Sequence, residues 1–228
     1  MNLNRYKIVI PARGGSKRFP GKNTVNFIDK PLISHSIEYA LNFFPSNSIW
    51  VNTDDDEISS IAIKSGINLT KRPFELATDT ASTVDVLKYQ CKEFEKMSIE
   101  YDTIILLQAT NPIRPQNLIE NTIFEFEKSK RKSLASFTIL NKKIGNIVNN
   151  YFTPTNYLPG QRMQDLKPDY FENGLIYITS RNSILEGCII TKDVYPYIYN
   201  GIESYVDIDE PVDLIFAEFI YNKLKNTL

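Results

Sequence analysis

The stretch "YKIVIPARGGSKRFPGKNTVNFIDKPLISHSIEYALNFFPSNSIWVNTD" (residues 6–54) contains two kinds of hydrophobic pattern. The apolar runs at 6–12 and 48–54, rich in Ile and Val, predict two buried strands. Between them, residues 31–44 place apolar side chains on one helical stripe behind a proline, which suits the start of a helix. Two strands joined by a helix in this way indicate a parallel sheet.

The alternation of strands and helices continues along the chain. Helical patterns occupy residues 56–66, 82–97 and 115–130, and apolar runs that predict strands occupy 103–109 and 133–140. This order predicts an α/β fold with a mostly parallel sheet and helices on both faces. Because such sheets bind ligands at the carboxyl ends of their strands, the side chains that follow the strands should converge on one crevice.

The pattern breaks after residue 140. Residues 141–170 are polar and irregular, and a segment of this length is usually functional or packs on another chain. Regular patterns then return as strands at 174–179 and 204–209 and a closing helix at 211–226. We therefore expect a single domain over residues 1–228 with a protruding insertion at about 141–172.

The composition excludes several classes of protein. Of 228 residues, 42% are hydrophobic and 23% charged, and the net charge of −1 draws the chain to neither nucleic acid nor an anionic membrane. No apolar run approaches the ~20 residues of a membrane helix, and the first run is too short for a signal peptide. Cys91 and Cys188 fit no zinc or disulfide spacing. We expect a protein of the cytoplasm.

His35 is the only histidine of the chain, and it lies in a helical pattern beside apolar residues. A structural role fits this position better than a catalytic one. Without a second histidine or a cysteine in a reactive context, Ser/His and Cys/His nucleophilic catalysis are excluded. Chemistry would have to use phosphates, a metal ion and cationic side chains.

The segment "IPARGGSKRFPGKN" (10–23) is similar to a phosphate-binding loop. Its glycines would let backbone N–H groups approach an anion, and Arg13, Lys17 and Lys22 could balance much of the charge of a triphosphate. The spacing of a P-loop fails, because five residues separate Gly15 from Gly21 and Asn23 stands where Ser or Thr should be. The alternative is a solvated basic turn.

Two carboxylates alternate in "YVDIDEPVDL" (205–214). On a strand, Asp207 and Asp209 would project to the same face and repel each other unless a cation lay between them. Mg²⁺ suits such a pair, because it binds through few carboxylates and completes its shell with water or phosphate oxygens. The alternative is structural, with Asp209 as the cap of the helix that Pro211 starts.

Two further polar residues follow predicted strands. Gln108 stands at the strand exit in "LLQATNPIRP" (106–115). Arg72 precedes a proline in "KRPFELATDTAS" (71–82), which holds it extended and would let it reach a phosphate. A polar strand end and a surface arginine are the commoner outcomes for such residues, so both alternatives stay open.

Together these motifs resemble those of the N-acylneuraminate cytidylyltransferase family, the CMP-sialic acid synthetases. The segment 10–23 is similar to the nucleotide loop of that family, and "RPFELATDTAS", "LLQATNPIR", "RMQDLKPDYFENGLIYI" and "VDIDEPVDL" follow in the family's order. The resemblance spans residue 8 to about 214. It implies a Rossmann-like enzyme that joins a nine-carbon 2-keto acid sugar to CMP, with CTP as donor and pyrophosphate as leaving group.

The resemblance also implies roles for particular residues. Asp207 and Asp209 would hold Mg²⁺, which Mn²⁺ could replace, while Arg13 and Lys22 stabilise charge during in-line attack of the anomeric hydroxyl on the α-phosphate. Asp209 is the candidate to assist deprotonation. The nucleotide would be held by Arg13, Ser16, Lys22, Asn23, Arg72 and Thr83, and the acyl sugar by Gln108 and Arg162.

Arg162 lies in the insertion and would act in the site of a neighbouring subunit, so the resemblance implies a homodimer. Two positions depart from the family pattern: Met163 replaces a second basic residue, and Phe171 stands where an arginine is frequent. Both lie near the sugar side, so a legionaminic, pseudaminic or eight-carbon ulosonic acid is an alternative substrate. A sugar-1-phosphate nucleotidyltransferase is a rival activity, and a non-catalytic nucleotide-binding regulator is a rival of another class.

Overall fold

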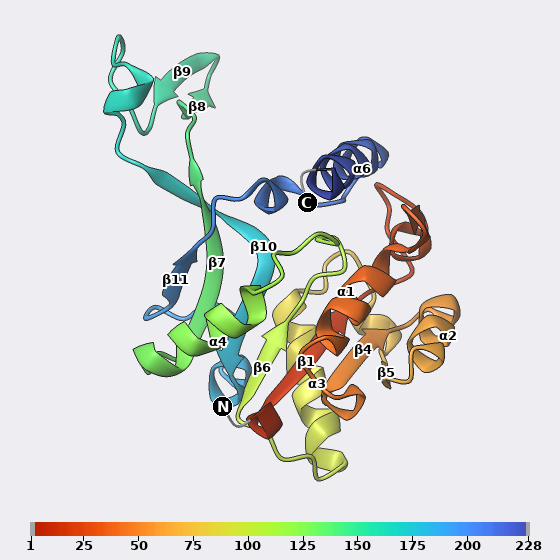
Figure 1. Ribbon diagram of the computed structural model, residues 1–228. Helices are drawn as coiled ribbons and strands as arrows, with labels where there is room; N and C mark the ends of the chain where they lie inside the picture. The colour runs from red at the N-terminus through yellow and green to blue at the C-terminus, as the bar shows by residue number, and fades with distance from the viewer. Residues whose placement is uncertain (1–2, 227–228) are drawn as a thin grey trace.

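The computed structural model describes residues 3–226 and contains a seven-stranded central sheet (Figure 1). The strand order is β11-β7-β10-β6-β1-β4-β5. Its strands are β1 (Tyr6–Pro11), β4 (Ile49–Thr53), β5 (Asn68–Lys71), β6 (Thr103–Leu106), β7 (Ser133–Leu140), β10 (Asp169–Ser180) and β11 (Tyr195–Ile198). Only β10 runs antiparallel to its neighbours, β6 and β7, so the expected mostly parallel sheet is confirmed.

Strand β1 lies in the middle of the sheet because its side chains are apolar on both faces. Ile8 aligns with Ile49 of β4 on one side and with Ile105 of β6 on the other. All three side chains have 0% exposure. A strand covered on both faces has a continuous apolar run in place of an alternating one, which is the pattern of residues 6–12.

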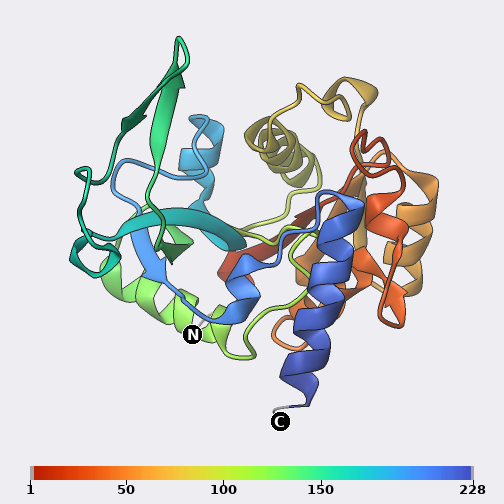
Figure 2. The same ribbon diagram turned by 90° about the horizontal axis from the view of Figure 1, so that it is seen from above.

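Helices cover both faces of the sheet (Figure 2). They are α1 (Leu32–Leu41), α2 (Asp56–Lys64), α3 (Thr83–Lys96), α4 (Leu118–Ser129), α5 (Arg181–Leu185) and α6 (Pro211–Lys225). Apolar side chains of α1, α2 and α4 pack on one face, those of α3 and α5 pack on the other, and α6 closes a third cluster around Phe27 and Ile208. Between residues 3 and 226, no helix combines the length and apolarity needed to cross a bilayer.

The chain between β7 and β10 projects from the body of the protein (Figure 1). The prediction of irregular structure is wrong for part of this arm, because β8 (Gly145–Val148) and β9 (Tyr151–Pro154) form an antiparallel hairpin. Asn149 and Asn150 join the two strands with φ angles of 51° and 65°. Two-residue hairpin turns favour residues that tolerate positive φ, and asparagine is one of them. A second small ladder pairs β2 (Asn26–Phe27) with β3 (Lys30–Pro31).

The predicted strand at 204–209 is also wrong. A 3-10 helix at Ile202–Tyr205 is followed by an extended segment outside the sheet. Its backbone is held by the loop after β6, where the N–H of Ile208 donates to the carbonyl of Thr110. Val206 and Ile208 are 1% and 0% exposed, so the alternation persists and the intervening aspartates lie on the opposite side.

Candidate active site

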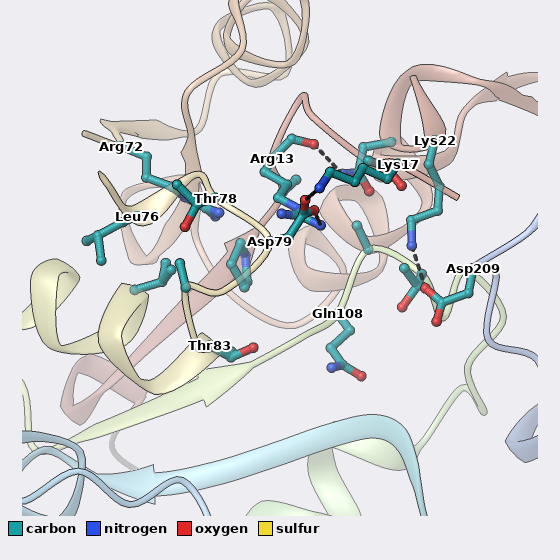
Figure 3. A pocket seen from close by; sticks show the side chains of 18 of the residues that line it. Arg13, Lys17, Lys22, Arg72, Leu76, Thr78, Asp79, Thr83, Gln108 and Asp209 are labelled. Carbon is teal, nitrogen blue, oxygen red and sulfur yellow. Dashed lines mark hydrogen bonds and ion pairs between the residues drawn. The ribbon is translucent and has the colours of Figure 1, made fainter. Parts of the chain in front are cut away.

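A cavity of about 470 Å³ opens at the carboxyl ends of β1 and β6, bordered by the loop that precedes α3 (Figure 3). Parallel strands lie on both sides of β1, with the chain running first to β4 and later to β6. Such a reversal of strand order leaves a crevice between the flanking loops. The cavity wall includes Arg13, Ser16, Lys22, Asn23, Arg72, Thr83, Gln108 and Asp209.

The loop after β1 is folded tightly against its neighbours. The N–H of Gly14 donates to Oδ1 of Asp54 at 3.2 Å, just beyond the end of β4. A Cβ on Gly14 would lie 2.5 Å from Oδ2 of Asp55, so only glycine allows this approach. Farther along the loop, Nδ2 of Asn23 donates to the carbonyl of Arg13 at 2.9 Å. The loop therefore closes on itself and directs its basic side chains at one cavity.

Each cation of this loop faces a carboxylate. Arg13 Nη2 and Lys17 Nζ lie 2.7 and 2.6 Å from the two carboxylate oxygens of Asp79. Lys22 Nζ and Arg18 Nη2 lie 2.6 and 2.5 Å from the two oxygens of Asp209. Arg18 Nη1 also lies 3.8 Å from Oε1 of Glu210. The cavity wall itself holds five cationic side chains and two carboxylates, and so keeps an excess of positive charge.

Arg72 is held in the cavity wall by a buried polar network. It is 7% exposed, so the alternative of a surface arginine is wrong. Its Nε and Nη2 donate to Oδ1 and the carbonyl of Asn52 at 2.8 and 2.7 Å, and Asn52 in turn donates to Gln90. Burial lowers the pKa of Arg72 to about 10, although the charge of Asp54 opposes the shift. Neither Asn52 nor Gln90 carries a sequence signal beyond being a polar residue in an apolar pattern.

Gln108 lies between β6 and the strand β10 that crosses beside it. A Cβ on Gly174 would lie 2.5 Å from Oε1 of Gln108 and 2.7 Å from Oδ1 of Asn111, and the φ of Gly174 is +74°. Glycine is therefore required where β10 passes these amides. Oδ1 of Asn111 is buried without a hydrogen-bond partner among the described residues, while its Nδ2 donates to the carbonyls of Asn173 and Val206.

The two aspartates differ in their surroundings. Desolvation raises the pKa of Asp207, a hydrogen bond with Thr110 opposes this, and the charge of Asp209 adds to the rise. Burial would also raise the pKa of Asp209, but the hydrogen bonds and charges of Lys22 and Arg18 outweigh it and lower that pKa. Asp209 is therefore a weaker base than an ordinary aspartate while both cations remain on it.

The structural alternative, in which Asp209 caps α6, is wrong because another residue takes that position. Glu210 precedes α6 as its N-cap residue. Asp213, in the first turn, accepts hydrogen bonds from the N–H groups of Asp209 and Glu210 at 2.9 and 2.7 Å. The carboxylate of Asp209 thus points at the basic loop and is free of any capping role.

Two of the predicted site residues lie outside the cavity wall. Asp207 lies one residue before the buried Ile208 and adjoins the site through Asp209. Arg162 lies on the arm, where its guanidinium is paired with the carboxylate of Asp165 at 2.8 Å. The folded chain does not bring Arg162 to the cavity wall of the same subunit.

The sequence model of one family, described as Cytidylyltransferase, matches residues 7–226, and the chain belongs to this family. It is 33% identical over 222 residues to the CMP-N,N'-diacetyllegionaminic acid synthase of Legionella pneumophila, covering 94% of this chain and 95% of that protein. It is also 33% identical over 224 residues to the pseudaminic acid cytidylyltransferase of Campylobacter jejuni, covering 93% and 94%. An N-acylneuraminate cytidylyltransferase of Streptococcus agalactiae is 31% identical over 217 residues, which are 91% of this chain and 51% of that longer protein.

Solved structures support the fold. A CMP:2-keto-3-deoxy-manno-octonic acid synthetase complexed with CTP superposes with a TM-score of 0.69 at 20% identity, covering 96% of this chain and 99% of that one. A 4-diphosphocytidyl-2C-methyl-D-erythritol synthase from Anaerococcus prevotii gives a TM-score of 0.66 at 13% identity, covering 96% and 98%. The predicted Rossmann-like fold and the family resemblance are both confirmed.

Proposed function

We propose that this chain transfers CMP from CTP to a nine-carbon 2-keto acid sugar and releases pyrophosphate. The observation that carries the proposal is the cavity itself, where four cations of one closed loop and the buried Arg72 face a single space at the strand ends. A triphosphate matches such a concentration of positive charge. The names of the relatives supply the acceptor class, because they include legionaminic, pseudaminic and N-acylneuraminic acid enzymes.

The reaction needs little covalent chemistry from the protein. The anomeric hydroxyl oxygen of the sugar attacks the α-phosphorus, its bond to phosphorus forms, the bond to the bridging oxygen breaks, and pyrophosphate leaves with that oxygen. The hydroxyl proton passes to solvent or to an aspartate. Arg13, Lys17 and Lys22 would hold the phosphates in line and stabilise the charge that grows on the leaving oxygens. Gln108 would contact the sugar beside β10.

The donor set fits the expected magnesium ion. Among residues 3–226 no group of three or more His, Cys, Asp or Glu is arranged for a metal. The expected ligands are the two carboxylates of Asp207 and Asp209. Mg²⁺ commonly binds proteins through one or two carboxylates and takes its remaining ligands from phosphates and water. When bound, the ion would withdraw charge from the phosphate oxygens. Lys22 and Arg18 would then move from Asp209 to the phosphates, which frees that carboxylate.

The identity of the sugar is the finer part of the proposal. N-acylneuraminate is the expected acceptor from the motifs, whereas two relatives matched over 95% and 94% of their length are named for legionaminic and pseudaminic acid. Phe171 packs on Tyr205 with ring centroids 5.8 Å apart, where other members of the family frequently carry an arginine.

Pyrophosphate release tests the proposal directly. Purified protein with CTP and Mg²⁺ receives N-acetylneuraminate, N,N'-diacetyllegionaminate, pseudaminate or the eight-carbon ulosonic acid in parallel. We expect release with at least one nine-carbon acid, and the acid with the highest kcat/KM identifies the acceptor. If CTP binds but none of the acids gives release, the protein is a nucleotide-binding regulator. If a sugar 1-phosphate alone gives release, it is a sugar-1-phosphate nucleotidyltransferase.

Asp209→Asn tests the assignment of the acidic pair. The variant keeps the size of the side chain but loses the charge that faces Lys22 and Arg18. We expect turnover to fall by at least ~100-fold, about 3 kcal/mol of barrier. Asp56→Asn is the matched control, because Asp56 is an exposed carboxylate paired with Lys71. Near-normal turnover of folded Asp209→Asn would remove Asp209 from the catalytic residues.

The arm supports a second proposal, that two copies of the chain form a homodimer. The arm exposes apolar side chains, among them Ile147 at 73%, Tyr151 at 78% and Leu158 at 75%. Exposed apolar residues gathered on a projecting element are typical of a surface that another chain covers. Arg162 lies on the same arm and would reach the sugar carboxylate in the partner's cavity.

A further inference from the structure

Asp79 is a carboxylate in the wall of a cavity that is otherwise built for an anion. It lies on the segment between β5 and α3, whose residues Leu76, Thr78 and Ala81 also line the cavity. Figure 3 shows Asp79 beside Arg13, whereas Asp209 lies beside Lys22. Asp79 has no role in the proposed transfer reaction.

Asp79 pairs with two cationic side chains that a polyphosphate would also bind. Its Oδ1 lies 2.7 Å from Nη2 of Arg13, and its Oδ2 lies 2.6 Å from Nζ of Lys17. These distances are those of charge-assisted hydrogen bonds. A phosphate oxygen that binds Arg13 and Lys17 from within the cavity would replace these carboxylate oxygens or lie against them, and two anions in contact repel.

The ion pairs of Asp79 are also weak enough for a ligand to take the place of its carboxylate. The side chains of Lys17 and Asp79 are 84% and 35% exposed, and ion pairs at such positions contribute little to stability. The hydrogen bonds of Lys17 and Arg13 nevertheless lower the pKa of Asp79, against the opposing effect of its partial desolvation, so the carboxylate is charged at neutral pH. A ligand with several negative charges can therefore displace Asp79, at a cost in affinity.

We propose that Asp79 is a specificity-determining residue that competes with the phosphate chain of the nucleotide for Arg13 and Lys17. The competition weakens binding of triphosphate and pyrophosphate while leaving a single phosphate, which Lys22 and Arg72 can hold, largely unaffected. After the transfer, Asp79 returns to the cations and favours release of pyrophosphate, a step that limits turnover in many enzymes. The inference rests on the proposed function in taking a nucleoside triphosphate as the ligand.

Asp79→Asn removes the charge with little change in shape, and Glu75→Gln makes the same charge change on the same segment at a residue outside the cavity wall. Titration calorimetry without divalent cations, at one low ionic strength, measures the affinity of each variant for CTP, CMP and inorganic triphosphate. We expect Asp79→Asn to bind CTP and inorganic triphosphate roughly fivefold more tightly. CMP affinity, and all affinities of Glu75→Gln, should stay within about twofold of the wild type.

The probes separate this inference from the proposed function. If the wild type binds inorganic triphosphate but not CTP, and Asp79→Asn binds it more tightly, the role of Asp79 stands and the nucleotide assignment fails. If the wild type binds CTP and Asp79→Asn binds it with equal or lower affinity, Asp79 supports the loop and does not compete with the ligand. An equal gain for CMP and CTP would overturn the claimed selectivity for the phosphate chain.

Discussion

At the scale of one residue, Arg114 links the loop after β6 to β10. It is 9% exposed, and among the described residues its guanidinium donates to the carbonyls of Leu175 and Gln108 and to the hydroxyl of Ser36, at 2.7 to 2.9 Å. None of these partners is a carboxylate, and burial lowers the pKa of Arg114 to about 10. The guanidinium of Arg114 therefore connects the backbone at Gln108, just after β6, to the backbone of β10 at Leu175.

Replacement of Arg114 should cost stability. Arg114→Met removes the side-chain donor of the Leu175 carbonyl, and it leaves the Gln108 carbonyl with only the longer hydrogen bonds from Ser36 and Asn111. We expect the free energy of unfolding to fall by about 2–4 kcal/mol in urea titrations. Arg114→Lys keeps the charge but not the planar fork, so its loss should be smaller. Ser36→Ala, which removes only the hydroxyl, should cost about 1 kcal/mol. Wild-type stability of Arg114→Met would show that the carbonyls find other donors.

His35 makes stability depend on pH. It is 9% exposed, and because its Nε2 lies 2.9 Å from the carbonyl of Phe27, that nitrogen carries the hydrogen. Burial lowers the pKa of His35, although the hydrogen bond to Phe27 opposes the shift. The unfolded chain then binds the proton more readily than the folded one. The free energy of unfolding should therefore fall as pH drops below about 6.5, until the lowered pKa is passed.

A variant isolates this contribution because the chain has no second histidine. His35→Gln keeps a donor for the carbonyl of Phe27 and does not titrate. Its stability should change less steeply between pH 5 and 7, by at most the ~1.4 kcal/mol per pH unit that one proton produces. Equal slopes for wild type and variant in urea titrations would show that the acid response comes from carboxylates alone.

At the scale of the element, the start of α6 fixes Asp209. The carboxylate of Asp213 accepts hydrogen bonds from the N–H groups of Asp209 and Glu210, so the helix cap and the proposed catalytic carboxylate of Asp209 share one support. Asp213→Ala should lower the free energy of unfolding by about 1 kcal/mol and also reduce kcat, because the backbone of Asp209 loses its anchor. Glu218→Ala, on the same helix but away from the cap, should change neither. If the kcat of Asp213→Ala equals that of Glu218→Ala, the helix cap does not contribute to catalysis.

Most of the elements could be predicted from the sequence because their patterns are local. The predicted strand at 133–140 coincides with β7, and Ser82 caps α3 by accepting the N–H of Asp85. The failures arise where tertiary contacts decide. Residues 204–209 have a strand-like alternation, but they pack on the loop after β6 and not on a strand. Strand β5 has an ordinary polar sequence and is a strand because β4 lies beside it.

The residues of the candidate site also divide into those that the sequence predicts and those that it does not. The basic loop could be predicted because its glycines and cations are consecutive, and all of Arg13, Ser16, Lys22 and Asn23 line the cavity. Arg72, Thr83, Gln108 and Asp209 reach the cavity from other segments, and their motifs predicted them, but nothing in the sequence singled out Asp79. Asp79 meets Arg13 only because the segment after β5 turns toward the loop after β1. A carboxylate in such a segment is, in sequence alone, an ordinary polar surface residue.

At the scale of the whole molecule, the arm predicts the state of association. Tyr151→Asp combined with Leu158→Asp places charges among the exposed apolar side chains of the arm, and sedimentation at micromolar concentration should change from dimer to monomer. Phe124→Asp is the control, because Phe124 is a similarly exposed apolar residue on α4. The monomer should bind CTP but lose turnover, since Arg162 no longer reaches a partner. A wild type that sediments only as monomer would exclude this role.

The single antiparallel strand affects how the protein folds while it is being synthesised on the ribosome. The strands β1, β4, β5 and β6 are complete once residue 106 has been made, but the outer edge of β6 pairs with β10, which ends at Ser180. At ~5–20 residues per second, that edge stays open for on the order of ten seconds. An unpaired edge of apolar strand is a template for pairing with other chains. The nascent chain, more than the finished enzyme, is thus the form that most needs a chaperone.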